Sequence, residues 1–251
     1  MTPEAEILFG FNPVLAVLTD PSRPVESLWI VTGQHGNRMR EVERCASERG
    51  IRPKFVERVV VERLTGGATH QGVALRVGAR VQPTWDDLLA RLDGLREPVL
   101  LLLDGIEDPR NLGAIIRSAE AFGVEAVILP RDRSAPMSGV AVKASAGAAE
   151  RVDVIRVTNL ARAMNELKEY GVRVIGLDGD ADATLGEEPW DGALAMVLGG
   201  EGRGLRRLTR ERCDAVVAIP MVGGVGSLNV ATAAGIALYA VQRGRRMDGR
   251  G

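Results

Sequence analysis

One stretch near the end of the chain decides its fold: AVVAIPM at residues 215–221, VGGVG at 222–226 and SLNVA at 227–231. The first part is an apolar, β-branched run that Pro220 ends, which predicts a strand. A glycine-rich loop follows, and then an alanine-rich segment that predicts a helix, with Ser227 and Asn229 as candidate N-caps. A strand, a tight loop and a helix in this order leave backbone N–H and C=O groups free for a ligand.

Upstream of this stretch, apolar runs alternate with segments of helical periodicity. The runs predict buried strands at 99–103, 124–129, 152–157, 172–177 and 193–198. Helices are predicted between them, among others at 111–122 and 140–149. This alternation predicts a parallel α/β sheet, which binds ligands where the carboxyl ends of its strands meet. We therefore expect three loops to gather there: 104–111, 199–204 and 220–229.

The front of the chain has a different pattern. Short strands and helices over residues 1–78 predict a small α/β domain without a catalytic constellation, so we interpret it as a binding module. Residues 79–97, with Pro83 and a short predicted helix, form an expected linker. Residues 98–247 form the second domain.

Composition limits the protein class. With 251 residues, 45% of them apolar and 26% charged, the sequence fits a globular protein of one or two domains. Cys45 and Cys213 are isolated, and the two histidines lack metal-ligand spacing, so we expect neither a disulfide framework nor a metal site. The absence of a membrane-length apolar run and of a signal peptide favours the cytoplasm.

Charge is distributed unevenly, although the net charge is −1. Residues 203–251 hold nine arginines and three acidic residues. This asymmetry indicates a basic surface for a polyanion, and a solvated C-terminal tail explains it equally well.

The two glycine-rich loops narrow the class of ligand. Neither contains GxxxxGK[ST], so a triphosphate would lack its main charge partner. The glycines also come too late in the chain for a dinucleotide fingerprint, which disfavours a dehydrogenase. Loops lined by backbone suit a less charged ligand, such as an adenosine ring.

Five polar residues lie on the three loops or beside them. Their structural interpretations are helix N-caps (Asn111, Ser227, Asn229), a solvated helix arginine (Arg117) and a partner of a helix N-terminus (Glu201). Five such residues on three converging loops favour a binding or catalytic site over five separate structural roles.

Three motifs coincide with these loops. They read DPRNLGAIIR at 108–117, LGGEGRGL at 198–205, and IPM with SLNVA at 219–221 and 227–231. In this order they resemble the motifs of the SpoU family of RNA ribose 2′-O-methyltransferases, within the SPOUT class. In the front domain, FGFNPV at 9–14 and HQGV at 70–73 are similar to the ribosomal-L30e-like substrate-binding domain of the family branch that modifies a 23S rRNA guanosine.

The resemblance implies a deep trefoil knot near the C-terminus, bound S-adenosylmethionine, and a homodimer whose active site draws on both subunits. By position, the cofactor-binding residues would be Gly199, Gly200, Gly204, Ile219, Met221 and Leu228. The catalytic surroundings would be Asn111, Arg117, Glu201, Ser227 and Asn229.

The activity that the resemblance implies is methyl transfer to a ribose 2′-OH, and the front domain favours 23S rRNA as the substrate. The family proposal gives the 2′-OH proton to the arginine matching Arg117, but a guanidinium stays charged near neutral pH. We expect Arg117 to stabilise the developing alkoxide and hold a phosphate. The alternatives are a tRNA ribose methyltransferase, which in this family lacks the front domain, and a non-catalytic RNA-binding protein.

Overall fold

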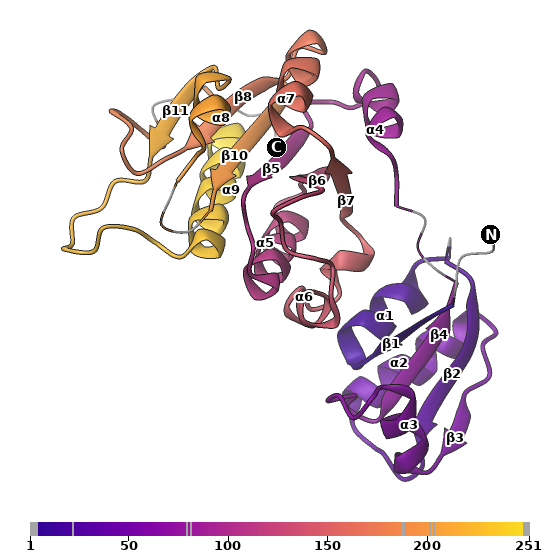
Figure 1. The fold of residues 1–251 in the computed structure, drawn as a ribbon. Coiled ribbons are helices and arrows are strands. Elements are labelled where there is room, and N and C mark those ends of the chain that lie inside the picture. The colour runs from indigo at the N-terminus through magenta and orange to yellow at the C-terminus, as the bar shows by residue number, and fades with distance from the viewer. Residues whose placement is uncertain are drawn as a thin grey trace. The chain divides into compact units, whose positions relative to one another are not determined.

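A computed structural model gives the fold of the chain (Figure 1). The residues described below are 5–21, 23–78, 80, 82–186, 189–200, 202 and 204–247. The chain divides into two units, and each is described by itself. The first unit consists of residues 1–81 with 146–151, and the second of 82–145 with 152–251.

The first unit is built on a mixed sheet. Among its described residues the strand order is β1-β4-β2-β3, in which β4 (Val73–Val77) is antiparallel to β1 (Glu6–Phe9) and to β2 (Val25–Val31). β3 (Lys54–Val56) pairs with β2 in parallel. Its helices are α1 (Phe11–Thr19), α2 (Asn37–Glu48), α3 (Arg58–Leu64) and the 3-10 helix η1 (Ala148–Glu150). Because α1, α2 and the sheet share one apolar core, the small α/β domain predicted at the front is confirmed.

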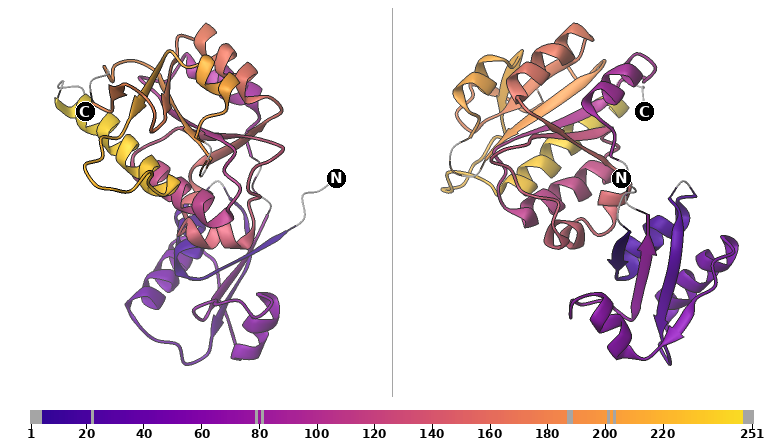
Figure 2. Two further views of the ribbon diagram at one scale, coloured as in Figure 1. Left: turned by 60° about the vertical axis from the view of Figure 1, so that its left-hand side comes forward. Right: turned by 45° about the vertical axis from the view of Figure 1, so that its right-hand side comes forward.

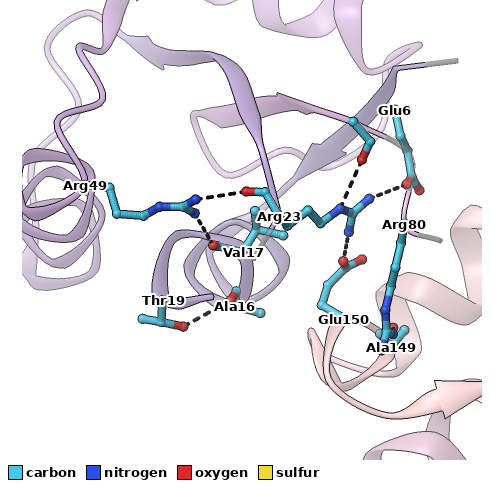
Figure 3. Close-up of polar contacts among 10 residues, drawn as sticks. Glu6, Ala16, Val17, Thr19, Arg23, Arg49, Arg80, Ala149 and Glu150 are labelled. Carbon is cyan, nitrogen blue, oxygen red and sulfur yellow. Dashed lines mark hydrogen bonds and ion pairs between the residues drawn. The ribbon is translucent and has the colours of Figure 1, made fainter. Parts of the chain in front are cut away.

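Arg23 connects several segments of the first unit (Figure 3). Its side chain is only 6% exposed, and its Nη2 donates to Glu6 Oε2 at 2.7 Å while its Nε donates to the Gly78 carbonyl at 3.2 Å. Its Nη1 forms an ion pair with the buried Glu150, and its own carbonyl accepts from Arg49 Nη2 at 2.9 Å. A buried guanidinium therefore holds the second chain segment of this unit to the first.

The second unit is built on a parallel sheet. In the part of the chain that the structure describes, seven strands have the order β7-β6-β5-β10-β8-β11-β9, and every pair runs in parallel. The strands are β5 (Val99–Asp104), β6 (Ala126–Pro130), β7 (Asp153–Val157), β8 (Arg173–Leu177), β9 (Ala183–Thr184), β10 (Leu194–Gly199) and β11 (Ala215–Ala218). The predicted parallel α/β sheet is therefore confirmed.

Helices cover both faces of this sheet, as expected when both faces of a parallel sheet are buried. Figure 2 shows α5 and α9 side by side on one face and α4 and α7 on the other. The helices are α4 (Trp85–Leu92), α5 (Pro109–Ala121), α6 (Gly139–Ala144), α7 (Leu160–Glu169), α8 (Arg207–Glu211) and α9 (Val230–Met247). α4 lies within the predicted linker, and its Leu88 and Leu92 are part of the core that α7 shares with the sheet.

Two predicted helix bounds were wrong. α5 begins at Pro109 and not at residue 111, because the Asp108 carboxylate caps it by accepting from Arg110 N–H at 2.8 Å. The helix predicted at 140–149 ends at Ala144, because Ala146 and Gly147 have positive φ angles of 52° and 93°. β9 and α8 were not predicted. The trefoil knot stays a prediction.

Candidate functional site

The loop after β10 is closed on itself and held against the loop after β5. Gly199 lies opposite Asp104 in the parallel register, and Gly200 and Gly204 form an antiparallel bridge. A Cβ atom on Gly199 would lie 2.0 Å from the Gly204 carbonyl carbon, and one on Gly200 would lie 2.4 Å from the Gly105 oxygen. Only glycine allows these backbones to approach so closely.

Asp104 fixes the far side of the same loop. Its carboxylate ends β5, and the side chain is only 1% exposed. It accepts from the Arg206 backbone N–H at 3.1 Å through Oδ2, and Oδ1 lies 3.4 Å from Arg206 Nε. A buried charge is thereby paired, and residues 204–206 are held to the carboxyl end of β5.

The third loop ends at Asn229, which joins two helices. Its Oδ1 accepts from the N–H groups of Ala231 and Thr232 at 3.0 and 3.3 Å, so it caps α9. Its Nδ2 donates to Asn111 Oδ1 on α5 at 3.0 Å. The cap interpretation of Asn229 is therefore confirmed, whereas Asn111 lies inside the first turn of α5, behind the Asp108 cap.

The loops after β10 and β11 surround one pocket of about 780 Å³, which is within the size range of small-molecule sites, while the loop after β5 lines a second pocket. All the residues that the sequence nominated for cofactor binding line the first pocket: Gly199, Gly200, Gly204, Ile219, Met221 and Leu228. Much of this lining is glycine backbone, so main-chain N–H and C=O groups are available to a ligand.

The nominated catalytic residues are only partly brought together. Ser227 and Asn229 line this pocket, and Asn111 lines a second one beside it. Arg117 is exposed on α5 and is not among the described residues that line either pocket. Glu201 lies outside the described residues.

Sequence reasoning missed one charged pair in the first pocket. Asp178, directly after β8, accepts from Arg210 on α8, with 2.8 Å between Oδ2 and Nη1. The sequence does contain a signal for Asp178, since it follows an apolar strand at the edge where the other two loops lie. Arg210 carries no comparable signal.

The thiol of Cys213, in the segment between α8 and β11, is unreactive. Burial raises the pKa of Cys213 to about 11, and its Sγ donates to the Thr209 carbonyl at 3.3 Å. A thiol that stays protonated near neutral pH is a poor nucleophile. Within the described ranges, the structure contains no cluster of His, Cys, Asp or Glu that fits a metal ion, and no helix with the length and apolarity of a membrane span.

Fold and site together define an α/β protein whose parallel sheet carries a small-molecule pocket at the carboxyl ends of its strands. Residues 98–239 match the SpoU rRNA Methylase family, and residues 7–82 match the domain described as RNA 2′-O ribose methyltransferase substrate binding. The chain therefore belongs to the SpoU rRNA Methylase family.

Individual relatives are similar over almost the whole chain. The 23S rRNA (guanosine-2′-O-)-methyltransferase RlmB of Photorhabdus laumondii is 44% identical, with 96% of this chain and 99% of the relative covered. The protein of the same name from Escherichia coli K12 is 42% identical, with the same coverage. Among solved structures, the SpoU methyltransferase AviRb from Streptomyces viridochromogenes in complex with AdoMet has a TM-score of 0.77 at 24% identity, covering 98% of this chain and 92% of that one.

Proposed function

We propose that the protein is an S-adenosylmethionine-dependent RNA methyltransferase that modifies the ribose 2′-OH of a guanosine in 23S rRNA. One observation carries this proposal: the second and third family motifs line one pocket, and Asn111 of the first motif is hydrogen-bonded to Asn229 of the third. Relatives that are 42–44% identical over nearly their full length bear names with this activity, which supports the choice of substrate.

The pocket fits the proposed cofactor. Its glycine-rich backbone offers N–H and C=O groups to an adenine ring, while Ile219, Met221 and Leu228 offer apolar contact. We assign these residues, with Gly199, Gly200 and Gly204, to cofactor binding. When bound, S-adenosylmethionine supplies a methyl group already activated on a sulfonium, so the protein needs to orient the acceptor and manage one proton.

The remaining residues would prepare the acceptor hydroxyl. Asn111 and Asn229, hydrogen-bonded to each other at 3.0 Å, would orient the ribose through their amide groups. Arg117 cannot accept a proton as a guanidinium, so we assign it to stabilising the alkoxide and gripping the adjacent phosphate. A phosphate oxygen or a water would then take the proton. Ser227 and Glu201 complete the proposed surroundings.

The first unit is proposed to hold the RNA. Its match to a substrate-binding domain supports this role, and it argues against a tRNA enzyme of the kind that lacks the domain. We retain the division into 1–78, a linker at 79–97 and a methyltransferase domain at 98–247. The proposed setting is the cytoplasm.

We further propose a homodimer in which Arg117 of one copy completes the pocket of the other. Arg117 is exposed and makes no ion pair with another residue in the described part of the chain. α9 also exposes apolar surface, since Tyr239 is 55% exposed and Ile236 is 37% exposed. Apolar side chains of this size on one helix suit a contact between copies.

A mixing experiment tests this arrangement. Arg117→Ala and Asn229→Ala are each expected to be inactive alone, whereas an equal mixture forms heterodimers with one intact site. If subunits exchange at random, the mixture recovers about a quarter of wild-type turnover. If the mixture is no more active than either variant, Arg117 acts on its own chain.

The activity itself is tested by mapping 2′-O-methyl groups on rRNA and tRNA from cells with and without the gene. Loss of one 23S guanosine modification is the expected result. Loss of a tRNA modification instead would identify a tRNA enzyme. Unchanged maps, with no uptake of S-adenosylmethionine by the purified protein, would favour a non-catalytic RNA-binding protein.

A further inference from the structure

A second pocket of about 420 Å³ adjoins the proposed cofactor pocket, and Gly200, Gly204 and Val230 line both. Asn111 also lines this second pocket. A methyl acceptor must touch the methyl donor in the reacting complex, so the acceptor nucleoside needs a site directly beside the cofactor. Within the described residues, this pocket meets that requirement and has the size of a small-molecule site.

The walls of the second pocket suit a flat ring. Ile106 and Val230 are buried apolar residues that contribute to its lining. Gly105 has no side chain, and a Cβ atom there would lie 3.3 Å from Arg206 Nη2. The Arg206 guanidinium therefore lies over bare backbone at the pocket wall.

The Nη1 and Nη2 groups of Arg206 are available as hydrogen-bond donors. Asp104 pairs with its Nε and backbone N–H, and the side chain remains 47% exposed. Its Nη1 and Nη2 make no hydrogen bond to other described residues. A guanidinium held on one side by a carboxylate keeps a fixed orientation, and its outer N–H groups are then free for a planar acceptor pair.

Glu107 provides a hydrogen-bond acceptor, whereas Arg206 provides donors. It is exposed, lines the same pocket, and pairs with no cation in the described part of the chain. An ionised carboxylate only accepts hydrogen bonds. The pocket thus presents donors from Arg206 and an acceptor from Glu107.

We propose that this pocket binds the target base and selects guanine, with Arg206 donating to O6 and N7 and Glu107 accepting from N1–H and N2–H. Guanine is the base that combines two adjacent acceptors with two adjacent donors. Adenine presents an N6 amino group where guanine has O6, so it would face the Arg206 donors with a donor of its own. The inference rests on the proposed function and extends it to the residues that choose the base.

The test uses RNA fragments that carry guanosine, inosine or 7-deazaguanosine at the position found by methyl mapping. Inosine lacks the N2 amine and 7-deazaguanosine lacks N7, so each analogue removes one proposed contact. The wild type should prefer guanosine over either analogue by about tenfold in kcat/KM. Glu107→Gln should lose the preference over inosine, and Arg206→Lys the preference over 7-deazaguanosine.

Arg207→Lys is the matched control, because Arg207 is exposed, pairs with Glu211 and is not among the described lining residues. It should keep both preferences. Calorimetric titration with S-adenosylmethionine checks that each variant retains its cofactor site. If Arg206→Lys does not bind the cofactor, the inference is judged from the guanosine-over-inosine preference of Glu107→Gln against that of the wild type. Equal wild-type rates on all three RNAs, or unchanged preferences in Glu107→Gln, would overturn the inference. A wild type that methylates none of them would instead overturn the proposed function, and the inference with it.

Discussion

Asn229 combines a structural and a proposed chemical role, and two substitutions separate them. Asn229→Ser keeps a side-chain oxygen for the α9 cap but cannot reach Asn111 as an amide does. We expect it to unfold at nearly the wild-type temperature with much lower turnover. Asn229→Ala should also lose about 1 kcal/mol of stability. Thermal unfolding and single-turnover methylation measure both effects, and normal turnover in Asn229→Ser would leave Asn229 with the cap alone.

Arg117→Lys tests whether the guanidinium geometry matters beyond its charge. Lysine keeps the positive charge but loses the planar fork that can hold an oxyanion and a phosphate together. Turnover should fall about 100-fold or more with unchanged affinity for S-adenosylmethionine. Arg162→Lys, on an exposed i,i+4 ion pair of α7, is the control and should behave as wild type. Near-normal turnover in Arg117→Lys would refute the proposed role.

At the scale of elements, the glycine loop depends on close backbone contact. Gly199→Ala would force Cβ against Gly204 and displace the loop from β5. We expect cofactor affinity to weaken by at least about tenfold. Gly223→Ala is a matched control in the third loop, because a Cβ atom there meets nothing within 4 Å. Calorimetric titration distinguishes them, and equal affinities would show that the loop tolerates the added methyl group.

The sequence predicted those features that depend on contiguous residues. The long apolar strands and the three motif loops are local patterns, so their meeting at one sheet edge followed from the parallel order. The pair of Asp104 with Arg206 joins positions far apart in the chain, and no local pattern marks it. The early end of α6 depends on a positive φ at Ala146, a residue type that normally continues a helix. The two residues of β9 are too few to show a period.

At the scale of the whole molecule, acid should weaken the first unit. His70 is buried, and its Nδ1 accepts from the Gly72 N–H at 3.0 Å. Burial, with Arg58 nearby, lowers the pKa of His70 below its ordinary value of 6.5. The folded state thus holds this imidazole neutral while the unfolded state takes up a proton. Its contribution to stability is present above pH 6.5 and is lost as the pH falls.

His70→Asn keeps an acceptor for Gly72 but has no titrating ring. The melting temperature of the wild type should fall more steeply between about pH 7.5 and pH 5.5 than that of the variant. Parallel slopes in thermal unfolding would show that His70 does not contribute to the acid sensitivity.

The Arg23–Glu150 ion pair has a consequence for engineering by domain exchange. A chimaera that transplants residues 1–81 alone would keep the Glu6 partner of Arg23 but lose Glu150, because Glu150 is encoded in the middle of the other module. Loss of one of the two carboxylates that pair with this guanidinium lowers the stability of the transplanted domain. A chimaera that keeps this domain intact therefore needs residues 146–151 as well as 1–81. The two segments are not contiguous in the gene.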